Sequence, residues 1–234
     1  MTVGYVIALV MALGLLVAYA MVVRGKDIWL GLLFVCVTVV NLGYLLLSVA
    51  SNLPMAILAN DVAYLGSVFL SMCMLFSIVR LCGSPLRRWH VILAMVVGVL
   101  MFALVATSGL LPWYYADVQL ETVDGATRLV KTYGVLHPVY TVYLLGYFGL
   151  MIATIIRSVQ GKRPGSQKLA GVLAGVVCGN ILVWLFEKFL PLEFEFLAVT
   201  YIFSELILLL LYWMMQDYVL VRDIPKFTPA EQRQ

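Results

Sequence analysis

The most unusual chemistry in this sequence is a carboxylate inside an apolar run. Residues 201–214 read YIFSELILLLLYWM, and Glu205 stands within them. A carboxylate near the centre of a membrane helix costs about 2–4 kcal/mol on insertion scales, so the protein must tolerate it or use it. At a rise of about 1.5 Å per residue, Glu205 would lie roughly 15 Å below the outer rim of its helix. We expect Glu205 to be neutral, hydrogen-bonded or hydrated. It would then either form the floor of a pocket or make a hydrogen bond that holds this helix in place.

Other polar and aromatic residues recur at helical spacing in the outer halves of the apolar runs. His137 and Tyr140 are three residues apart, and Asn180, Trp184 and Glu187 follow one another at i, i+4 and i+7. Aromatic walls with a few polar anchors are typical of a small-molecule pocket. The candidate ligand-binding residues are Asp61, Tyr114, Tyr115, His137, Tyr140, Asn180, Trp184, Glu187, Glu193, Tyr201 and Glu205.

Several of these residues have a plainer structural interpretation. Asn60 and Asp61 stand near the start of an apolar run, where they could cap a helix. A lone histidine such as His137 is often a satisfied core residue. Glu193 and Glu195 would lie near the outer interface, where a charge costs little.

Catalytic and cofactor chemistry lacks its usual residues in this sequence. The two histidines, His90 and His137, are expected on opposite sides of the membrane, which argues against a metal cluster or a bis-histidine haem. The last apolar run holds no lysine for a retinal Schiff base, and no GxSxG, HExxH or phosphate-cradling loop occurs. The cysteines are not placed for an extracellular disulfide. The sequence therefore predicts no catalytic site, no metal and no cofactor.

The composition indicates an integral membrane protein. Of 234 residues, 64% are hydrophobic and 12% are charged, and the mean hydropathy is +1.04. Apolar runs of about 20 residues, the length that crosses a bilayer, follow one another along the chain. We expect an all-α membrane fold, a seven-transmembrane helix bundle, with spans at 3–23, 28–50, 57–80, 90–112, 134–157, 168–190 and 194–217. Residues 1–218 form one membrane domain in this interpretation, and residues 219–234 form a short cytoplasmic tail.

The basic residues predict the orientation of the bundle. With the N-terminus outside and the C-terminus inside, three of the fifteen Lys and Arg, namely Arg128, Lys131 and Lys188, lie outside and twelve lie in the cytoplasm. The net charge of +3 then describes a cytoplasmic basic belt rather than a nucleic-acid site. We expect a multi-pass protein of the cell membrane, with lipids as its neighbours and no nucleic acid.

The segment between the fourth and fifth spans differs from the short turns elsewhere. It reads YYADVQLETVDGATRLVKTYG, with two β-prone runs around Asp124 and Gly125, a dipeptide favoured in tight hairpins. We expect an extracellular β-hairpin over the outer mouth of the bundle. A hairpin alone is marginal in water, so it should rest on other loops or helix ends.

Four stretches carry a resemblance to a known family: ANDVAYLGSVFLSMCMLF, YYADVQLETVDG, LVKTYGVLHPVYTVYLLGYF and FEFLAVTYIFSELILLLLYW. The chain resembles the N-terminal seven-transmembrane sensor domain of bacterial histidine kinases, which is also fused to diguanylate cyclases and other outputs. The resemblance implies a sensory module whose seventh helix transmits a signal inward. Val135 stands where the family frequently has proline. No phosphoacceptor helix or ATP-binding domain follows, so we expect no kinase activity, and either an excised sensor or a stand-alone form that signals through a partner.

The favoured function is a membrane receptor of bacterial signal transduction. A small ligand or lipid would enter an outward-facing pocket, shift helices five to seven between two packings and move residues 216–222. The main alternative is a proton-coupled small-solute carrier that uses Glu205 and Asp61, and a third is a scaffold that only binds partner helices. The expected partners are lipids, an unknown small ligand, and a cytoplasmic signalling partner or fused output domain. A second copy of the chain, forming a homodimer, is a further alternative.

Overall fold

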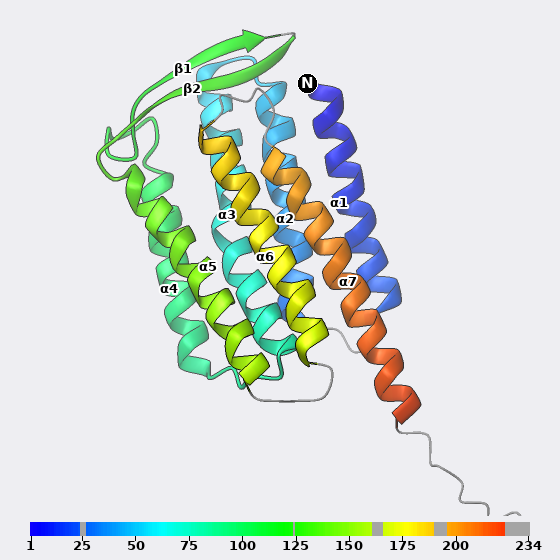
Figure 1. Cartoon of the computed structure of the whole chain (residues 1–234). Coiled ribbons are helices and arrows are strands. Elements are labelled where there is room, and N and C mark those ends of the chain that lie inside the picture. The colour runs from blue at the N-terminus through cyan, green and yellow to red at the C-terminus, as the bar shows by residue number, and fades with distance from the viewer. Residues whose placement is uncertain (24–26, 124, 161–165, 190–195, 223–234) are drawn as a thin grey trace, which may run out of the picture.

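The fold is a bundle of long helices with a β-hairpin across one end (Figure 1). The computed structural model describes residues 1–23, 27–123, 125–160, 166–189 and 196–222. Within these ranges the helices are α1 (Thr2–Val22), α2 (Ile28–Ser48), α3 (Leu53–Leu81), α4 (Arg88–Val105), α5 (His137–Gln160), α6 (Ser166–Phe189) and α7 (Phe196–Arg222). The strands are β1 (Tyr115–Val123) and β2 (Ala126–Tyr133). Residues 223–234 of the predicted tail lie outside the described ranges.

The helices have the length and composition of membrane spans. Among the described residues, six are long and apolar enough to cross a bilayer, and the corresponding apolar part of α7 is Val199–Met214. Large apolar side chains such as Val10, Leu100 and Val142 are exposed on the outside of the bundle, where lipid would cover them. The prediction of a membrane helix bundle is confirmed.

Polar caps determine where α2 and α3 begin. The Asp27 carboxylate accepts hydrogen bonds from the backbone N–H groups of Trp29 and Leu30, and also from Arg80 Nε at 2.9 Å. The Asn52 side chain accepts from the Met55 N–H, so α3 begins at Leu53 rather than at the predicted residue 57.

This earlier start corrects the capping interpretation of Asn60 and Asp61. Both residues lie about two turns inside α3, where the intrahelical bonds are already made. Hydropathy alone predicts too late a start, whereas Pro54 in the first turn is favourable at the beginning of a helix and indicates the earlier one.

The backbones of α2 and α3 approach each other at glycines. A Cβ atom added to Gly43 would lie 2.4 Å from the backbone nitrogen of Ala63, and one added to Gly66 would lie 2.6 Å from the Cys36 carbonyl oxygen. Small residues of this kind allow close helix packing in membranes. The pair α2–α3 therefore forms a tight junction. α1, α4, α5 and α7 each pack against one of these two helices, and α6 packs against α5 and α7.

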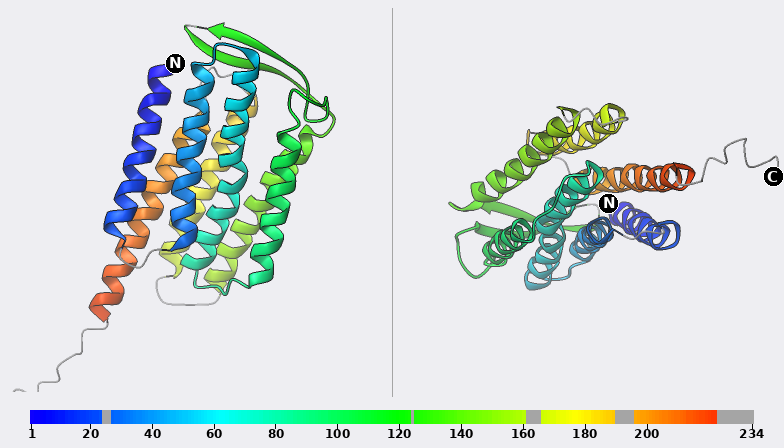
Figure 2. Two further views of the ribbon diagram at one scale, coloured as in Figure 1. Left: turned by 180° about the vertical axis from the view of Figure 1, so that it is seen from behind. Right: turned by 90° about the horizontal axis from the view of Figure 1, so that it is seen from below.

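The hairpin lies across the end of the bundle at which α1 begins (Figures 1 and 2). The strands β1 and β2 are antiparallel, with Val118 opposite Lys131, and Gly125 has a positive φ of 73° in the turn. Asp124, the other residue of the predicted turn, lies outside the described residues. The Thr127 hydroxyl donates to the Ala50 carbonyl at 2.9 Å, so the hairpin is bonded to the α2–α3 connection. We call this end the hairpin end and the opposite one the loop end.

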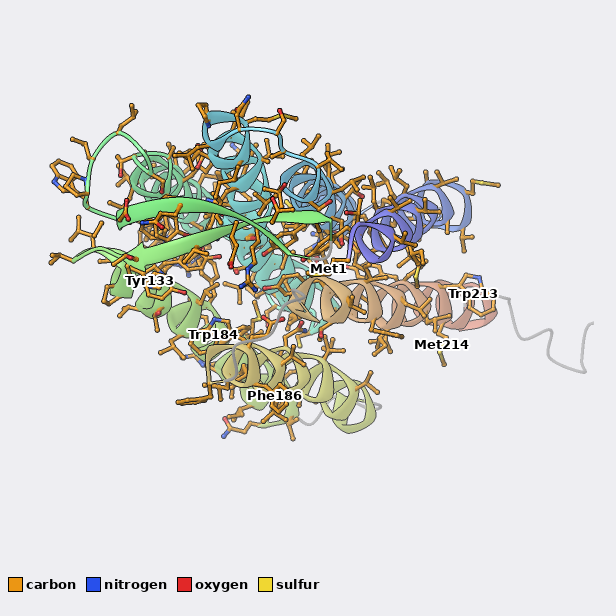
Figure 3. The ribbon with its side chains drawn as sticks, turned by 90° about the horizontal axis from the view of Figure 1, so that it is seen from above. Met1, Tyr133, Trp184, Phe186, Trp213 and Met214 are labelled. Carbon is orange, nitrogen blue, oxygen red and sulfur yellow. The ribbon has the colours of Figure 1, made fainter. Side chains whose placement is uncertain are left out.

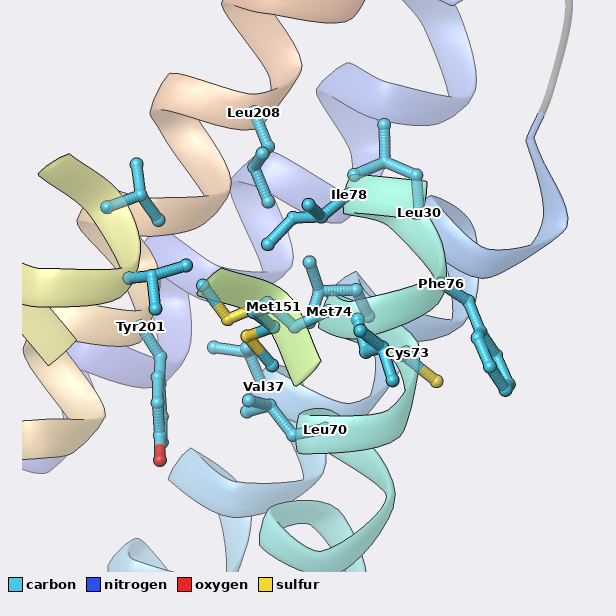
Figure 4. Packing of buried hydrophobic residues seen from close by; sticks show 14 of the residues in the cluster. Leu30, Val37, Leu70, Cys73, Met74, Phe76, Ile78, Met151, Tyr201 and Leu208 are labelled. Carbon is cyan, nitrogen blue, oxygen red and sulfur yellow. The ribbon is translucent and has the colours of Figure 1, made fainter. Parts of the chain in front are cut away.

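The buried apolar side chains of the described residues form three clusters, and two of them, the main core and the hairpin-end cluster, concern the site. The main core combines residues of α1, α2, α3, α5, α6 and α7, and Figure 4 shows Leu208 of α7 among side chains from the other helices. The hairpin-end cluster contains Val68, Met101, Val105, Tyr114 and Tyr115. Three partly buried residues pack against both clusters, and they are Phe69, Tyr140 and Tyr143.

Candidate functional site

Tyrosines gather beneath the hairpin. Tyr114 is 0% exposed and Tyr115 is 2% exposed, and both pack against α3 where the chain enters β1. The Tyr64 hydroxyl of α3 lies 2.8 Å from the Tyr115 hydroxyl, and the Tyr64 ring meets the rings of Tyr114 and Tyr140 edge to face at 5.8 and 5.3 Å. We name this group, with Tyr133 and His137, the aromatic cluster.

The two hairpin phenols of the cluster stay protonated at physiological pH. Burial is the largest cause that raises the pKa of Tyr114 and of Tyr115, and the neighbouring Tyr64 phenol raises both further. Each therefore keeps an O–H group that can donate a hydrogen bond.

His137 joins the cluster because the backbone at Gly134 lies close to that of residues 113 and 114. A Cβ atom on Gly134 would lie 2.4 Å from the Trp113 carbonyl oxygen, and the Gly134 N–H donates to the Tyr114 carbonyl at 2.8 Å. This close approach places the His137 ring against Tyr133, with ring centroids 3.9 Å apart, and 5.2 Å from the Tyr114 ring.

Two tyrosines of α5 connect the hairpin end to the main core. Tyr140 and Tyr143 pack against both clusters, and the Tyr143 hydroxyl donates to the Val68 carbonyl at 2.8 Å. Tyr140 also interacts electrostatically with Tyr201 of α7, which is 6% exposed in the main core. Tyr140 and Tyr143 thus lie between the hairpin-end cluster and the main core, to which Tyr201 belongs.

A pair of opposite charges borders the aromatic cluster. Lys131 Nζ lies 5.4 Å from the ring centroid of Tyr115 and 5.8 Å from that of Tyr64. Lys131 is also the charged group that interacts with Asp61. The Asp61 Oδ1 atom is buried and has no hydrogen-bond partner within the described ranges.

A second polar group lies deeper, between α6 and α7. The Asn180 amide donates to the Ser204 hydroxyl at 2.7 Å, and both side chains are buried. Glu205, the next residue, is 0% exposed, and neither of its carboxylate oxygens has a hydrogen-bond partner among the residues the structure describes. Cys36 of α2 is its electrostatic neighbour. The bond between α6 and α7 is therefore carried by Ser204, and the bond expected for Glu205 is not among the described contacts.

The predicted site residues thus divide into groups. Tyr114, Tyr115, His137 and Tyr140 meet in the aromatic cluster, with Asp61 beside Lys131 at its border. The other predicted residues lie farther along the chain, on α6 and α7. Asn180 donates a hydrogen bond to Ser204, Trp184 packs against the main core, and Glu187 is half-buried. Tyr201 and Glu205 are buried in α7, and Glu193 lies outside the described residues. Figure 3 shows Tyr133 and Trp184 as seen from the hairpin end.

Three residues of these groups were not among the sequence candidates. Tyr64 follows Asp61 by one helical turn, Lys131 shares a strand face with Tyr133, and Ser204 directly precedes Glu205. These spacings were visible in the sequence, but the partners belong to distant segments, so only the packing shows their role.

Comparison with protein families identifies a relationship that spans most of the chain. A family model described as the N-terminal 7TM region of histidine kinase matches residues 5–222, which include the aromatic cluster, the Asn180–Ser204 pair and α7. No curated protein matches the chain.

Proposed function

Because this chain belongs to the family of N-terminal seven-transmembrane regions of histidine kinases, which makes it a sensory module of the cell membrane, we propose that it senses at the aromatic cluster. A small molecule or lipid would bind there, and α7 would relay the change. The family match covers the sensor region and not a kinase catalytic domain, so the output would belong to a fused domain or a signalling partner.

The observation that supports this proposal is the position of Tyr140 and Tyr143. They pack against the hairpin-end cluster and against the main core, to which Tyr201, Leu208 and Leu209 of α7 belong. A ligand that rearranges the rings beneath the hairpin would change the packing of α5 and then of α7. Packed interfaces respond by moving between discrete arrangements, because a close-packed core does not deform continuously.

The distribution of charge supports an orientation in which the hairpin end faces outside. Arg80, Arg87, Arg88 and Arg157 all lie near the loop-end termini of α3, α4 and α5. By the positive-inside rule, the loop end would face the cytoplasm, and α7 would carry the signal toward it.

We predict that a thermal-shift screen of the purified protein against small molecules and lipids finds ligands whose effect depends on the aromatic cluster. A ligand at 100 times its Kd stabilises the protein by about 2.7 kcal/mol. Tyr115→Ala and His137→Ala should abolish the shift, since both rings line the cluster. Val135→Ala is the matched control, because Val135 is 89% exposed nearby. Hits whose shift is unchanged in both cluster variants would disprove the site.

One observation favours the alternative of a proton-coupled carrier. Glu205 is a fully buried carboxylate with no hydrogen-bond partner in the described ranges, as a proton-carrying residue could be. Uptake into proteoliposomes with and without a pH gradient separates the two functions. A sensor gives no flux in either condition, whereas a carrier gives flux that follows the gradient and is lost in Glu205→Gln.

A further inference from the structure

The contacts of Lys131 suggest what kind of ligand the aromatic cluster takes. Its ammonium group lies over the rings of Tyr115 and Tyr64, at 5.4 and 5.8 Å from their centroids. Both rings are held in place, because their hydroxyls are 2.8 Å apart and the Tyr115 side chain is buried. Two fixed rings and a cation between the hairpin and α3 form part of an aromatic cage.

Asp61 supplies the negative charge of the same cage. It stands three residues before Tyr64 on α3, so both side chains leave the same face of the helix. It interacts electrostatically with Lys131, and its buried Oδ1 atom has no hydrogen-bond partner among the described residues. A buried acceptor that lacks a donor and interacts with an ammonium group is complementary to a cation.

Lys131 itself is held loosely. Its distances to the two rings approach the limit of about 6 Å for a cation–π contact. A lysine ammonium is also a strongly hydrated point charge, so it loses more on leaving water than an alkylated ammonium does. The group is carried by a hairpin strand, which can withdraw it without unfolding a helix.

We propose that Tyr64, Tyr115 and Asp61 form a binding site for an alkylated ammonium group and that Lys131 occupies this site as an internal, displaceable ligand. The inference rests on the proposed function, since it names the ligand class for the same cluster. A trimethylammonium group meets the requirements: it is cationic, weakly hydrated and large enough to touch both rings. It can arrive as free choline or as the head group of phosphatidylcholine, and binding would release Lys131 and the hairpin from α3.

The test is a thermal-shift titration of the full chain in dodecyl maltoside, a detergent without an ammonium group. Choline is the probe, and its uncharged carbon analogue 3,3-dimethylbutanol is the control ligand. We expect choline to stabilise the protein and dimethylbutanol to have little effect. Nanodiscs of phosphatidylglycerol, with and without phosphatidylcholine, distinguish the lipid source from the free one: stabilisation by the lipid alone assigns the head group.

The decisive variant is Lys131→Met, which removes the internal cation and keeps an apolar side chain. We expect it to tighten choline binding by about tenfold if Lys131 fills the site about nine-tenths of the time. Asp61→Asn should weaken binding by about tenfold. Arg128→Met is the matched control, because Arg128 is on the same strand but pairs with Glu121 at 2.7 Å; it should leave the affinity unchanged.

Three results would overturn the inference. Equal shifts with choline and dimethylbutanol would mean that the cluster binds small molecules without sensing charge, which leaves the proposed function standing. Weaker choline binding in Lys131→Met would mean that Lys131 is not a competitor. No shift with choline or phosphatidylcholine in either wild type or Lys131→Met, when Lys131→Met unfolds cooperatively, would exclude this ligand class, while a hit from the wider screen would still support sensing at the cluster.

Discussion

Replacing Glu205 with methionine should raise the free energy of unfolding of the bundle by about 2–3 kcal/mol. The carboxylate is fully buried, and neither oxygen has a hydrogen-bond partner in the part of the chain that the structure describes. An acidic residue at the centre of a membrane helix costs about this much on insertion scales, and methionine fills a similar space without a polar group. Unfolding in mixed micelles with increasing dodecyl sulfate measures the change.

The adjacent residue is the control for this prediction. Ser204→Ala should lower the free energy of unfolding by about 0.6 kcal/mol, and at most about 1.7, because it removes the bond to Asn180. Opposite signs at neighbouring positions would show that α7 is bonded through Ser204 and not through Glu205. If Glu205→Met destabilises the protein as Ser204→Ala does, the carboxylate has a bonding partner and holds α7 in place.

The stabilised variant is also expected to respond less strongly to ligand. Residues that lower stability are often found at sites where the function requires them, because activity and stability can trade off against each other. Ligand-induced changes in α7 should therefore be smaller in Glu205→Met than in wild type, although the variant is more stable.

Replacing Gly43 with leucine should destabilise the bundle by about 3 kcal/mol or more. A Cβ atom at this position would lie 2.4 Å from the backbone nitrogen and 2.6 Å from the Cα of Ala63. Because the obstacle is backbone, no side-chain rotation relieves it, and α2 must separate from α3. Overpacking in a core costs about 1–3 kcal/mol when side chains can adjust, and here the junction itself has to open. The same micelle titration measures the effect.

A second glycine provides the control. Gly146 of α5 is exposed, and a Cβ atom added there would have no described atom within 4 Å. Gly146→Leu should be neutral or stabilising by up to about 1 kcal/mol, through helix propensity alone. Equal stability of Gly43→Leu and wild type would show that the α2–α3 junction is looser than described.

Hydropathy predicted most of the architecture because it reports which segments dissolve in lipid. It located the apolar helices from α1 to α7, and strand propensity around Gly125 located β1 and β2. Helix ends were less predictable, because they depend on single caps: Asn52 sets the start of α3, and α4 ends at Val105 rather than at the predicted residue 112.

The site was predictable only in part, because hydropathy does not show which helix faces meet. The helical spacing of His137 and Tyr140 predicts that they share one face, and in the structure the rings of Tyr114 and Tyr115 lie close to His137. The role of Lys131 depends on β-strand register and on the distance to α3, which local sequence does not encode.

The aromatic cluster and α7 should respond to ligand as one unit. Tyr140 packs against the hairpin-end cluster and against the main core, to which α7 contributes. Trp213 lies about 18 Å along α7 from Tyr201, toward the loop end. A spatial path alone does not prove coupling. Fluorine NMR of protein labelled with 5-fluorotryptophan, with the resonance assigned by Trp213→Phe, reports the packing of that end directly.

We expect Tyr140→Ala to shift or split the Trp213 resonance, because loss of the bridging ring changes the balance between two packings of α7. Val142→Ala, on the exposed face of the same helix, should leave the resonance unchanged. A Trp213 resonance that is identical in wild type and in a folded Tyr140→Ala variant would contradict the claim that the hairpin end communicates with the last helix.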